Sequence, residues 1–383
     1  MSDVLVIGDT FRCPELRHEI PLAVPDPFVY LEREGARHVY VSSMEADRIR
    51  GAAPGVTVHP LEEIGIDDLY AQGLGWLEIR LEGAARACVH AGLTNAIVPA
   101  TFPSAYLDRI RGEGIELGID QDAFNRRRRV KGGAELDGIR RAQIAAEAAM
   151  AEAVALLRSA ENGDGVLWLD GEPLTVERVK AVMRRVFSEH SCTADEFIVA
   201  PGPQGASGHE MGHGPIRVGD PIVFDLWPRD DASSCFADMT RTFVVGSVSD
   251  RVREWHALTK EALDASKALI SPGADCQDVF AAACDVYEAA GYATQRTKVD
   301  GEVLDHGFFH GLGHGVGLEV HEGPYMGRLP GGALVVGDVV TVEPGLYDPA
   351  VGGVRLEDLV LVTEDGCEVL TRFPYDLEPG GSA

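Results

Sequence analysis

Hydrophobic positions in the first third of the chain fall into short runs, and amphipathic stretches separate them. The runs are bounded by turn-forming residues, as buried strands are, and they lie at residues 4–7, 39–41 and 96–98. The stretches between them at residues 44–51 and 104–112 have helical character, and the second ends at a glycine that can cap a helix. With a closing strand at 115–120, the pattern predicts a modest α/β domain.

A different pattern begins after residue 129. The chain here is strongly helical in four long stretches, at residues 134–159, 175–188, 250–270 and 275–290. Strand-like segments and glycine-rich loops fill the rest, which gives this part an α+β character with mixed sheets. We therefore expect an α/β domain at residues 1–129 and an α+β domain at residues 130–383.

Four arginines at residues 126–129 mark this boundary. In an acidic protein they are expected to pair with the acidic surface of a neighbouring domain or subunit. An anion or nucleic-acid patch is the alternative, but so short a block gives it little support.

Composition narrows the class of protein. The 383 residues are 45% hydrophobic and 25% charged, as in soluble globular proteins with a core, and two domains fit this length. The net charge of −27 argues against nucleic-acid and anionic membrane partners. Neither a transmembrane run nor a secretory leader is recognisable. Seven cysteines without a C-x-x-C pair favour a reduced, cytoplasmic compartment.

Histidines concentrate in one segment. Four of the twelve lie within sixteen residues, at His306, His310, His314 and His321. Imidazole is the commonest metal ligand and a frequent acid or base. Glycine on both sides of His314 allows its backbone to approach an ion or ligand closely.

Carboxylates occur within or at the ends of four apolar, strand-like segments: Asp225, Asp238, Glu343 and Glu357. A carboxylate on a buried strand is unfavourable unless it is paired or binds a metal. The first two can lie on adjacent antiparallel strands, joined by the polar loop at residues 229–234. Four such carboxylates together favour a metal site over separate structural ion pairs.

With His314, these carboxylates suit two close divalent ions, with Mn²⁺ preferred and Co²⁺, Zn²⁺ or Fe²⁺ as alternatives. Two ions about 3.5–4 Å apart polarise a carbonyl group and generate hydroxide near neutral pH. The residues therefore predict a hydrolytic centre that cleaves a peptide-like C–N bond.

The motifs resemble those of the pita-bread metallopeptidases, which include Xaa-Pro dipeptidase, aminopeptidase P and the metal-free creatinase. They read DMTRT at 238–242, GHGVGLEVHE at 313–322, VEPG at 342–345 and GVRLED at 353–358. The resemblance covers residues 130–383 in motif order and implies a pita-bread catalytic domain. The preceding domain is similar to the N-terminal α/β domain of prolidases and creatinases.

The resemblance implies a role for each metal ligand. Asp225 would bind one ion, His314 and Glu343 the other, and Asp238 and Glu357 would bridge both. Glu343 would also take the proton of the attacking water.

The resemblance also implies residues that contact the substrate. His209 would hold the substrate or relay protons, and His321 would stabilise the oxyanion or position the scissile carbonyl. His310 would line the substrate side of the pocket. Arg355 would order the site or meet a substrate carboxylate.

Some features depart from the family pattern. Trp227 and Pro228 replace a glycine-containing turn after Asp225. The spacing from Asp225 to Asp238 is about two residues longer than usual. The loop after His209 is shorter than usual and carries a second histidine, His213. For Trp227 we favour packing and for His213 an exposed loop position. The ligands are intact, but strict prolyl specificity is left open.

The expected activity is therefore hydrolysis of Xaa-Pro dipeptides or of the N-terminal Xaa-Pro bond of short peptides. A metal-dependent hydrolase of small-molecule amides or amidines is the alternative, and a non-enzymatic binding module is a third possibility. The resemblance also implies a homodimer, in which one subunit's N-terminal domain helps to close its partner's site.

Overall fold

The computed structural model describes residues 2–379. The chain divides into two compact units, Met1–Arg128 and Arg129–Ala383, and the division lies one residue before the expected boundary. Across residues 2–379, no helix combines the length and the apolar character needed to cross a membrane.

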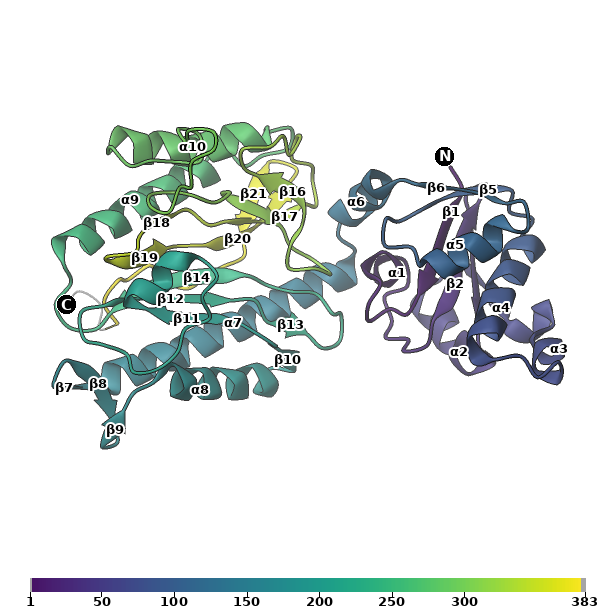
Figure 1. Cartoon of the computed structure of the whole chain (residues 1–383), viewed down its shortest axis with the longest axis horizontal. Coiled ribbons are helices and arrows are strands. Elements are labelled where there is room, and N and C mark those ends of the chain that lie inside the picture. The colour runs from purple at the N-terminus through teal and green to yellow at the C-terminus, as the bar shows by residue number, and fades with distance from the viewer. Residues whose placement is uncertain (1, 380–383) are drawn as a thin grey trace. The chain divides into compact units, whose positions relative to one another are not determined.

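The first unit is built on one six-stranded sheet with the order β4-β3-β2-β1-β5-β6 (Figure 1). Its strands are β1 (Val4–Gly8), β2 (Phe28–Arg33), β3 (Ala36–Val41), β4 (Val56–Pro60), β5 (Asn95–Val98) and β6 (Glu116–Ile119). Its helices are α1 (Pro14–Glu19), α2 (Ser43–Ala52), α3 (Ile66–Ala71), α4 (Trp76–His90), α5 (Ser104–Arg111) and α6 (Gln121–Arg129). The α/β character expected for this part is confirmed.

The central strand β1 explains why its sequence is a continuous apolar run. Successive side chains of a strand point to opposite faces of the sheet. Val4 and Val6 join one hydrophobic cluster, and Leu5 and Ile7 join another. A strand that is covered on both faces needs hydrophobic residues at every position rather than at alternate ones.

The second unit has the pita-bread arrangement expected from the motifs. Its main helices are α7 (Gly133–Ser159), α8 (Val176–Glu189), α9 (Asp250–Lys267) and α10 (Cys276–Ala289). The strands β12, β14, β17 and β20 lie between α7 and α8 on one side and α9 and α10 on the other (Figure 1). The two hydrophobic clusters of the unit fill these layers.

Two sheets of this unit contain most of the sequence motifs described above. One has the order β11-β12-β14, with β11 (Ile198–Pro201), β12 (Pro221–Leu226) and β14 (Met239–Val244). The other has the order β16-β15-β17-β20-β21, with β15 (Gly313–Gly315), β16 (Glu322–Met326), β17 (Val339–Val342), β20 (Asp358–Thr363) and β21 (Gly366–Val369).

Short strands complete the unit. They are β7 (Glu161–Gly163), β8 (Val166–Leu169), β9 (Glu172–Pro173), β10 (Cys192–Thr193), β13 (Arg229–Asp230), β18 (Gly345–Asp348) and β19 (Gly352–Arg355). The pair β18-β19 is antiparallel and brings Gly345 opposite Arg355.

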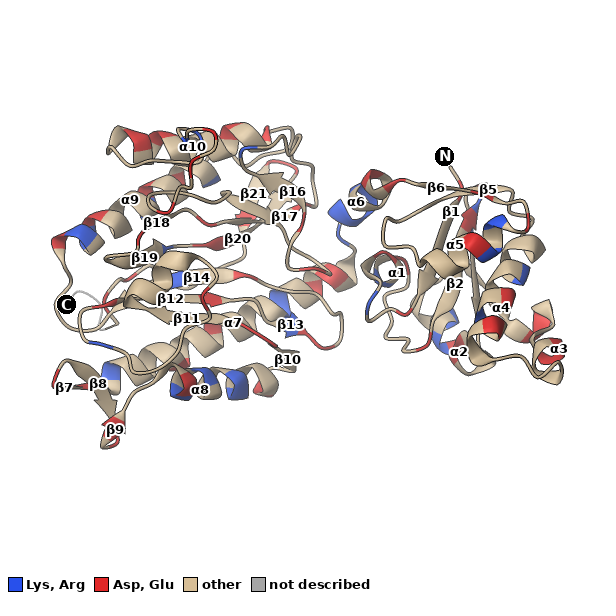
Figure 2. Cartoon of the chain, in the orientation of Figure 1, with Lys and Arg blue, Asp and Glu red and all other residues tan. Residues whose placement is uncertain are grey.

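Basic residues are concentrated at the end of α6 (Figure 2), and three of the four arginines of the run pair with carboxylates. Arg127 contacts Glu19 at 2.6 Å and donates to Glu32 at 2.9 Å. Arg129 binds Asp338 through two hydrogen bonds of 2.8 and 2.6 Å. The contacts of Arg127 correct the expectation for that residue, because Glu19 and Glu32 belong to its own domain. Arg129, at the expected boundary, binds Asp338 of the second unit.

The long helix α7 packs through small residues. Its buried face is rich in fully buried alanines, at positions 142, 145, 146, 149 and 153. Alanine favours the helix and lets α8 and the sheets approach closely. Its first turn is fixed by Glu135, whose carboxylate accepts a 2.6 Å hydrogen bond from the Gly132 N–H.

This packing can be tested with Ala149→Leu. Ala149 is fully buried, so the extra carbons must displace neighbours, and we expect a loss of about 1–3 kcal/mol of stability. The exposed Ala155 lies on the same helix, and Ala155→Leu should change stability by less than about 0.5 kcal/mol. Urea unfolding midpoints compare the variants, and equal midpoints would contradict the tight packing of this face.

Candidate metal centre

Two antiparallel strands bring the first two carboxylates together. Strand β12 pairs with β14 so that Asp225 lies opposite Thr240, and Asp238 immediately precedes β14. The adjacent antiparallel strands expected around Asp225 and Asp238 are therefore present. The side chain of Asp225 lines the same cavity as that of Asp238.

His314 lies on β15, where glycines on both sides permit close strand packing. A Cβ at Gly313 would meet the Thr341 carbonyl oxygen at 2.1 Å, and one at Gly315 would meet that of Gly323 at 2.3 Å. The Nδ1 of His314 lies 3.1 Å from the Gly315 carbonyl oxygen. That contact assigns the ring proton to Nδ1, so Nε2 is the nitrogen with a lone pair for a metal.

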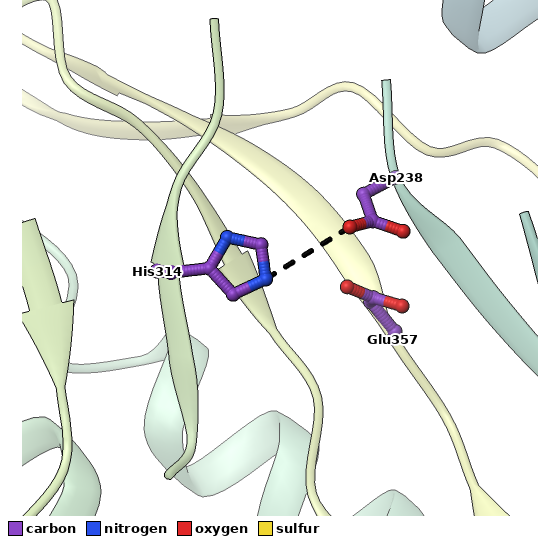
Figure 3. Close-up of side chains that lie close together, drawn as sticks. All are labelled: Asp238, His314 and Glu357. Carbon is purple, nitrogen blue, oxygen red and sulfur yellow. Dashed lines mark ion pairs between the residues drawn. The ribbon is translucent and has the colours of Figure 1, made fainter. Parts of the chain in front are cut away.

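The Nε2 atom of His314 faces three of the carboxylates. It lies 3.4 Å from Glu343 Oε1 and 3.9 Å from Asp238 Oδ2. One ligand atom each of Asp238, His314 and Glu357 lies within 4.8 Å of the others. Figure 3 shows these three side chains converging on one point. They come from segments far apart in the sequence, and the fold alone makes them neighbours.

All five predicted ligands line one cavity of about 560 Å³. Its wall also contains His209, His310, His321 and Arg355. The structure thus places every site residue expected from the sequence around a single space.

The charge of this cavity fits bound cations. Burial, and then repulsion from Glu357, raises the pKa of Asp238 well above its ordinary value. Burial likewise raises the pKa of Glu357, and that of Glu343 to about 8. In the part of the chain that the structure describes, the buried Oδ1 of Asp238 has no hydrogen-bond partner. Divalent ions would relieve the repulsion and satisfy this oxygen.

Arg355 is the cation that the protein itself supplies. It is buried, and its Nη2 pairs with Asp225. Its Nη1 donates to the Tyr347 hydroxyl at 2.9 Å, and its Nε donates to Thr240 Oγ1 at 3.3 Å. Of the two roles implied by the resemblance, these contacts favour ordering the site, since each guanidinium nitrogen already has a partner.

Thr240 and Tyr347 are functional residues that the sequence analysis missed. Thr240 donates a 2.7 Å hydrogen bond to Glu357 Oε2. The Tyr347 hydroxyl lies 2.9 Å from His310 Nε2. Thr240 could have been found, because it follows Asp238 by two positions and strand side chains repeat with that period. No comparable signal marks Tyr347.

The other histidines differ in their surroundings. His310 is buried between Tyr347 and the Gly311 carbonyl oxygen, and burial lowers its pKa to about 3. The His321 ring meets the His314 ring edge to face at 4.4 Å, and burial, then repulsion from His209, lowers the His321 pKa. Both rings are neutral at pH 7.

Two further histidines lie outside this wall. The side chain of His213 is 74% exposed and lies 3.8 Å from Glu210, so the expected exposed loop position is what the structure has. His306 is also exposed and pairs with Asp305 at 3.0 Å. Trp227, by contrast, lines the cavity as well as packing against the core.

Known proteins are similar to this chain in sequence and in fold. The chain is 35% identical over 185 residues to an Xaa-Pro dipeptidase of Pyrococcus furiosus, covering 48% of this chain and 49% of that protein. It is 32% identical over 268 residues to the probable dipeptidase PepE of Mycobacterium tuberculosis, covering 69% and 64%. The chain thus spans about half to two thirds of the length of these relatives.

Among solved structures, an X-Pro aminopeptidase from Thermotoga maritima has a TM-score of 0.78 at 22% identity, and the match covers 98% of this chain and 97% of that one. At this identity the likeness establishes the pita-bread fold with its N-terminal α/β domain. Residues 137–364, more than half of the chain, match the family model of metallopeptidase family M24. The chain therefore belongs to metallopeptidase family M24.

Proposed function

We propose that this protein is a metal-dependent peptidase that hydrolyses the Xaa-Pro bond of dipeptides or of the N-terminus of short peptides. The observation that carries this proposal is the convergence of five ligand residues on one cavity, with a buried Asp238 oxygen that lacks a protein partner among residues 2–379. Family membership and the names of the relatives support peptide hydrolysis.

We assign the metal ligands as Asp225, Asp238, His314, Glu343 and Glu357, which would hold the ions. Two divalent ions held there, Mn²⁺ by preference, supply a polarised scissile carbonyl and an acidified water. The carboxylates are grouped around His314 Nε2, so the protein presents its negative charge to one small volume. Arg355 and Thr240 hold Asp225 and Glu357 in place.

We assign proton transfer to Glu343. Its carboxylate accepts the proton of the attacking water and passes it to the leaving nitrogen. Burial raises its pKa to about 8 in the metal-free protein, and bound cations would lower it so that the ionised carboxylate can accept a proton. His321 then donates to the developing oxyanion or orients the carbonyl. His209 holds the substrate or relays protons. His310 positions the substrate, with its ring fixed by Tyr347.

The cavity suits a small peptide. Its volume of about 560 Å³ falls within the range of small-ligand sites. Aromatic side chains of Trp227, Phe309 and Tyr325 form part of its wall, and such rings pack well against an apolar prolyl ring. No observation favours the alternative substrate class of small-molecule amides or amidines. We further propose a cytoplasmic homodimer, by resemblance to prolidases and from the cysteine content.

A substrate panel tests the proposal. We expect Mn²⁺-loaded protein to cleave Ala-Pro, Ala-Pro-Ala or both, and to act more slowly on Ala-Ala-Ala, because the aromatic wall favours proline. Excess EDTA should abolish the activity. The ratio of dipeptide to tripeptide rates, measured by amino-acid release, distinguishes a dipeptidase from an aminopeptidase. Fully loaded protein that leaves all Xaa-Pro substrates intact would overturn the proposal.

The role of Glu343 is tested by Glu343→Gln. Removing a general base lowers kcat by about 10²–10⁴-fold, and loss of a ligand oxygen charge should also reduce the metal content. Steady-state kinetics and metal analysis measure both effects. Glu302 is exposed, so Glu302→Gln serves as the matched control and should retain activity. Undiminished kcat in Glu343→Gln would contradict the assignment.

The stability of the metal-free protein should depend on pH. Burial raises the pKa of Glu343 from 4.5 to about 8. The folded state therefore binds more protons than the unfolded state between these values, and the free energy of unfolding falls as pH rises. The buried His310 has a lowered pKa and gives the opposite slope only below about 6.5.

We therefore expect the thermal midpoint in EDTA to be lower at pH 8.5 than at pH 7. Added Mn²⁺ should raise the midpoint more at pH 8.5, because protons no longer compete for the ligands. Differential scanning calorimetry measures both shifts. The Glu343→Gln variant should show a flatter profile, and a midpoint that increases between pH 7 and 8.5 in EDTA would argue against buried, protonated carboxyls.

A further inference from the structure

Three histidines and a tyrosine form a cluster of rings in the first compact unit. They are His38, Tyr40, His59 and His90. The ring of His59 lies 5.4 Å from that of His38, 4.5 Å from that of Tyr40 and 5.5 Å from that of His90, measured between centroids. The metal centre of the second unit uses none of these residues, and no motif of the sequence points to them.

The fold accounts for this cluster. Strands β3 and β4 run parallel, with Tyr40 opposite His59 and His38 opposite Thr57. Side chains two positions apart on a strand share a face, so His38, Tyr40 and His59 lie on one face of the sheet. His90 is the last residue of α4 and contacts the same rings.

Hydrogen bonds fix the orientation of His59. Its Nδ1 lies 2.8 Å from Glu63 Oε2, and an ionised carboxylate only accepts. The neutral ring therefore carries its proton on Nδ1 and a lone pair on Nε2. A histidine that donates to a carboxylate in this way is the usual arrangement of a metal ligand and its supporting group.

A second imidazole nitrogen lies beside this lone pair. The Nδ1 of His38 is 3.1 Å from His59 Nε2, and because that nitrogen accepts, the His38 ring proton lies on Nδ1 in the metal-free protein. The other neutral tautomer of His38, with its proton on Nε2, has the Nδ1 lone pair that a metal needs. Two nitrogens bound tetrahedrally at 2.0–2.1 Å from one zinc ion lie roughly 3.4 Å apart, so a shift of a few tenths of an ångström would let both rings bind one ion. Burial, and then the neighbouring His59 and His90, lowers the pKa of His38, which leaves it in the neutral form that binds metals.

His90 is the third imidazole of the cluster. Its Nδ1 is 2.8 Å from the Tyr40 hydroxyl. The residue is exposed at the end of α4, and its ring centroid lies 5.5 Å from that of His59. Imidazole ligands suit Zn²⁺, Cu²⁺ and Ni²⁺ more than Mn²⁺ or Mg²⁺.

We propose that His38 and His59, with His59 oriented by Glu63, bind one transition-metal ion such as Zn²⁺ in the N-terminal unit. Water completes the coordination. This site is separate in its residues and in its ligand chemistry from the carboxylate-rich centre, because it offers nitrogen ligands only.

Zinc binding by tag-free, full-length protein tests the proposal. The double variant Asp238→Ala/Glu357→Ala removes the carboxylate-rich centre, and equilibrium dialysis against Zn²⁺ followed by elemental analysis gives the remaining stoichiometry. We expect one equivalent. Adding His59→Ala should remove it, whereas adding His306→Ala, an exposed histidine beside Asp305, should leave it. Glu63→Gln should keep the stoichiometry and weaken binding by about 10-fold.

The same substitutions in the wild-type background keep the test independent of the double variant's folding. His59→Ala should there bind one Zn²⁺ fewer than wild type and than His306→Ala, with unchanged peptidase activity after loading with Mn²⁺. Equal zinc stoichiometry and affinity in His59→Ala and His306→Ala would overturn the proposal and leave the cluster as a hydrogen-bonded ring stack.

Discussion

Mutual repulsion among buried carboxylates is the constraint on which the second unit depends. Asp238 and Glu357 are buried and Glu343 is half-buried beside them, and each has a raised pKa in the absence of metal. Such a group of like charges is unfavourable unless cations compensate for it. Arg355 compensates for part of the charge through Asp225. The negative charge that Arg355 does not compensate defines a site for divalent ions, and family membership agrees with that chemistry.

Paired strands and hydrogen-bonded side chains around the carboxylates hold this unfavourable arrangement in place. The β12-β14 pair and the β17-β20 pair hold the ligand segments by regular backbone hydrogen bonds. Glycines around His314 let β15 approach its neighbours closely. Arg355 connects Asp225, Thr240 and Tyr347, and Tyr347 in turn fixes His310. Asp225 and His310, on the wall of the same cavity, are thereby linked in one hydrogen-bonded network.

The first unit is organised by a different constraint, a sheet that is covered on both faces. Its hydrophobic clusters leave few positions for polar side chains. Four polar rings nevertheless lie in contact with one another on β3, β4 and α4. Their nitrogen and hydroxyl groups are paired with one another and with Glu63. Burial of polar groups is tolerable when each has a partner, and the same pairing orients the imidazoles as ligands.

The sequence by itself determined the α/β and α+β classes and the family, and it singled out the residues that we propose as metal ligands, because apolar periodicity and short motifs are local properties. It also indicated that Asp225 and Asp238 lie on adjacent strands, since a short polar loop joins them. Only the tertiary structure decided what depends on distant segments. It showed that Arg355 is held by Asp225 and Tyr347, that Thr240 supports Glu357, and that His213 points away from the site. The His38, His59 and His90 cluster was equally invisible in the sequence, because pairing register and helix placement, rather than any spacing along the chain, bring those rings together.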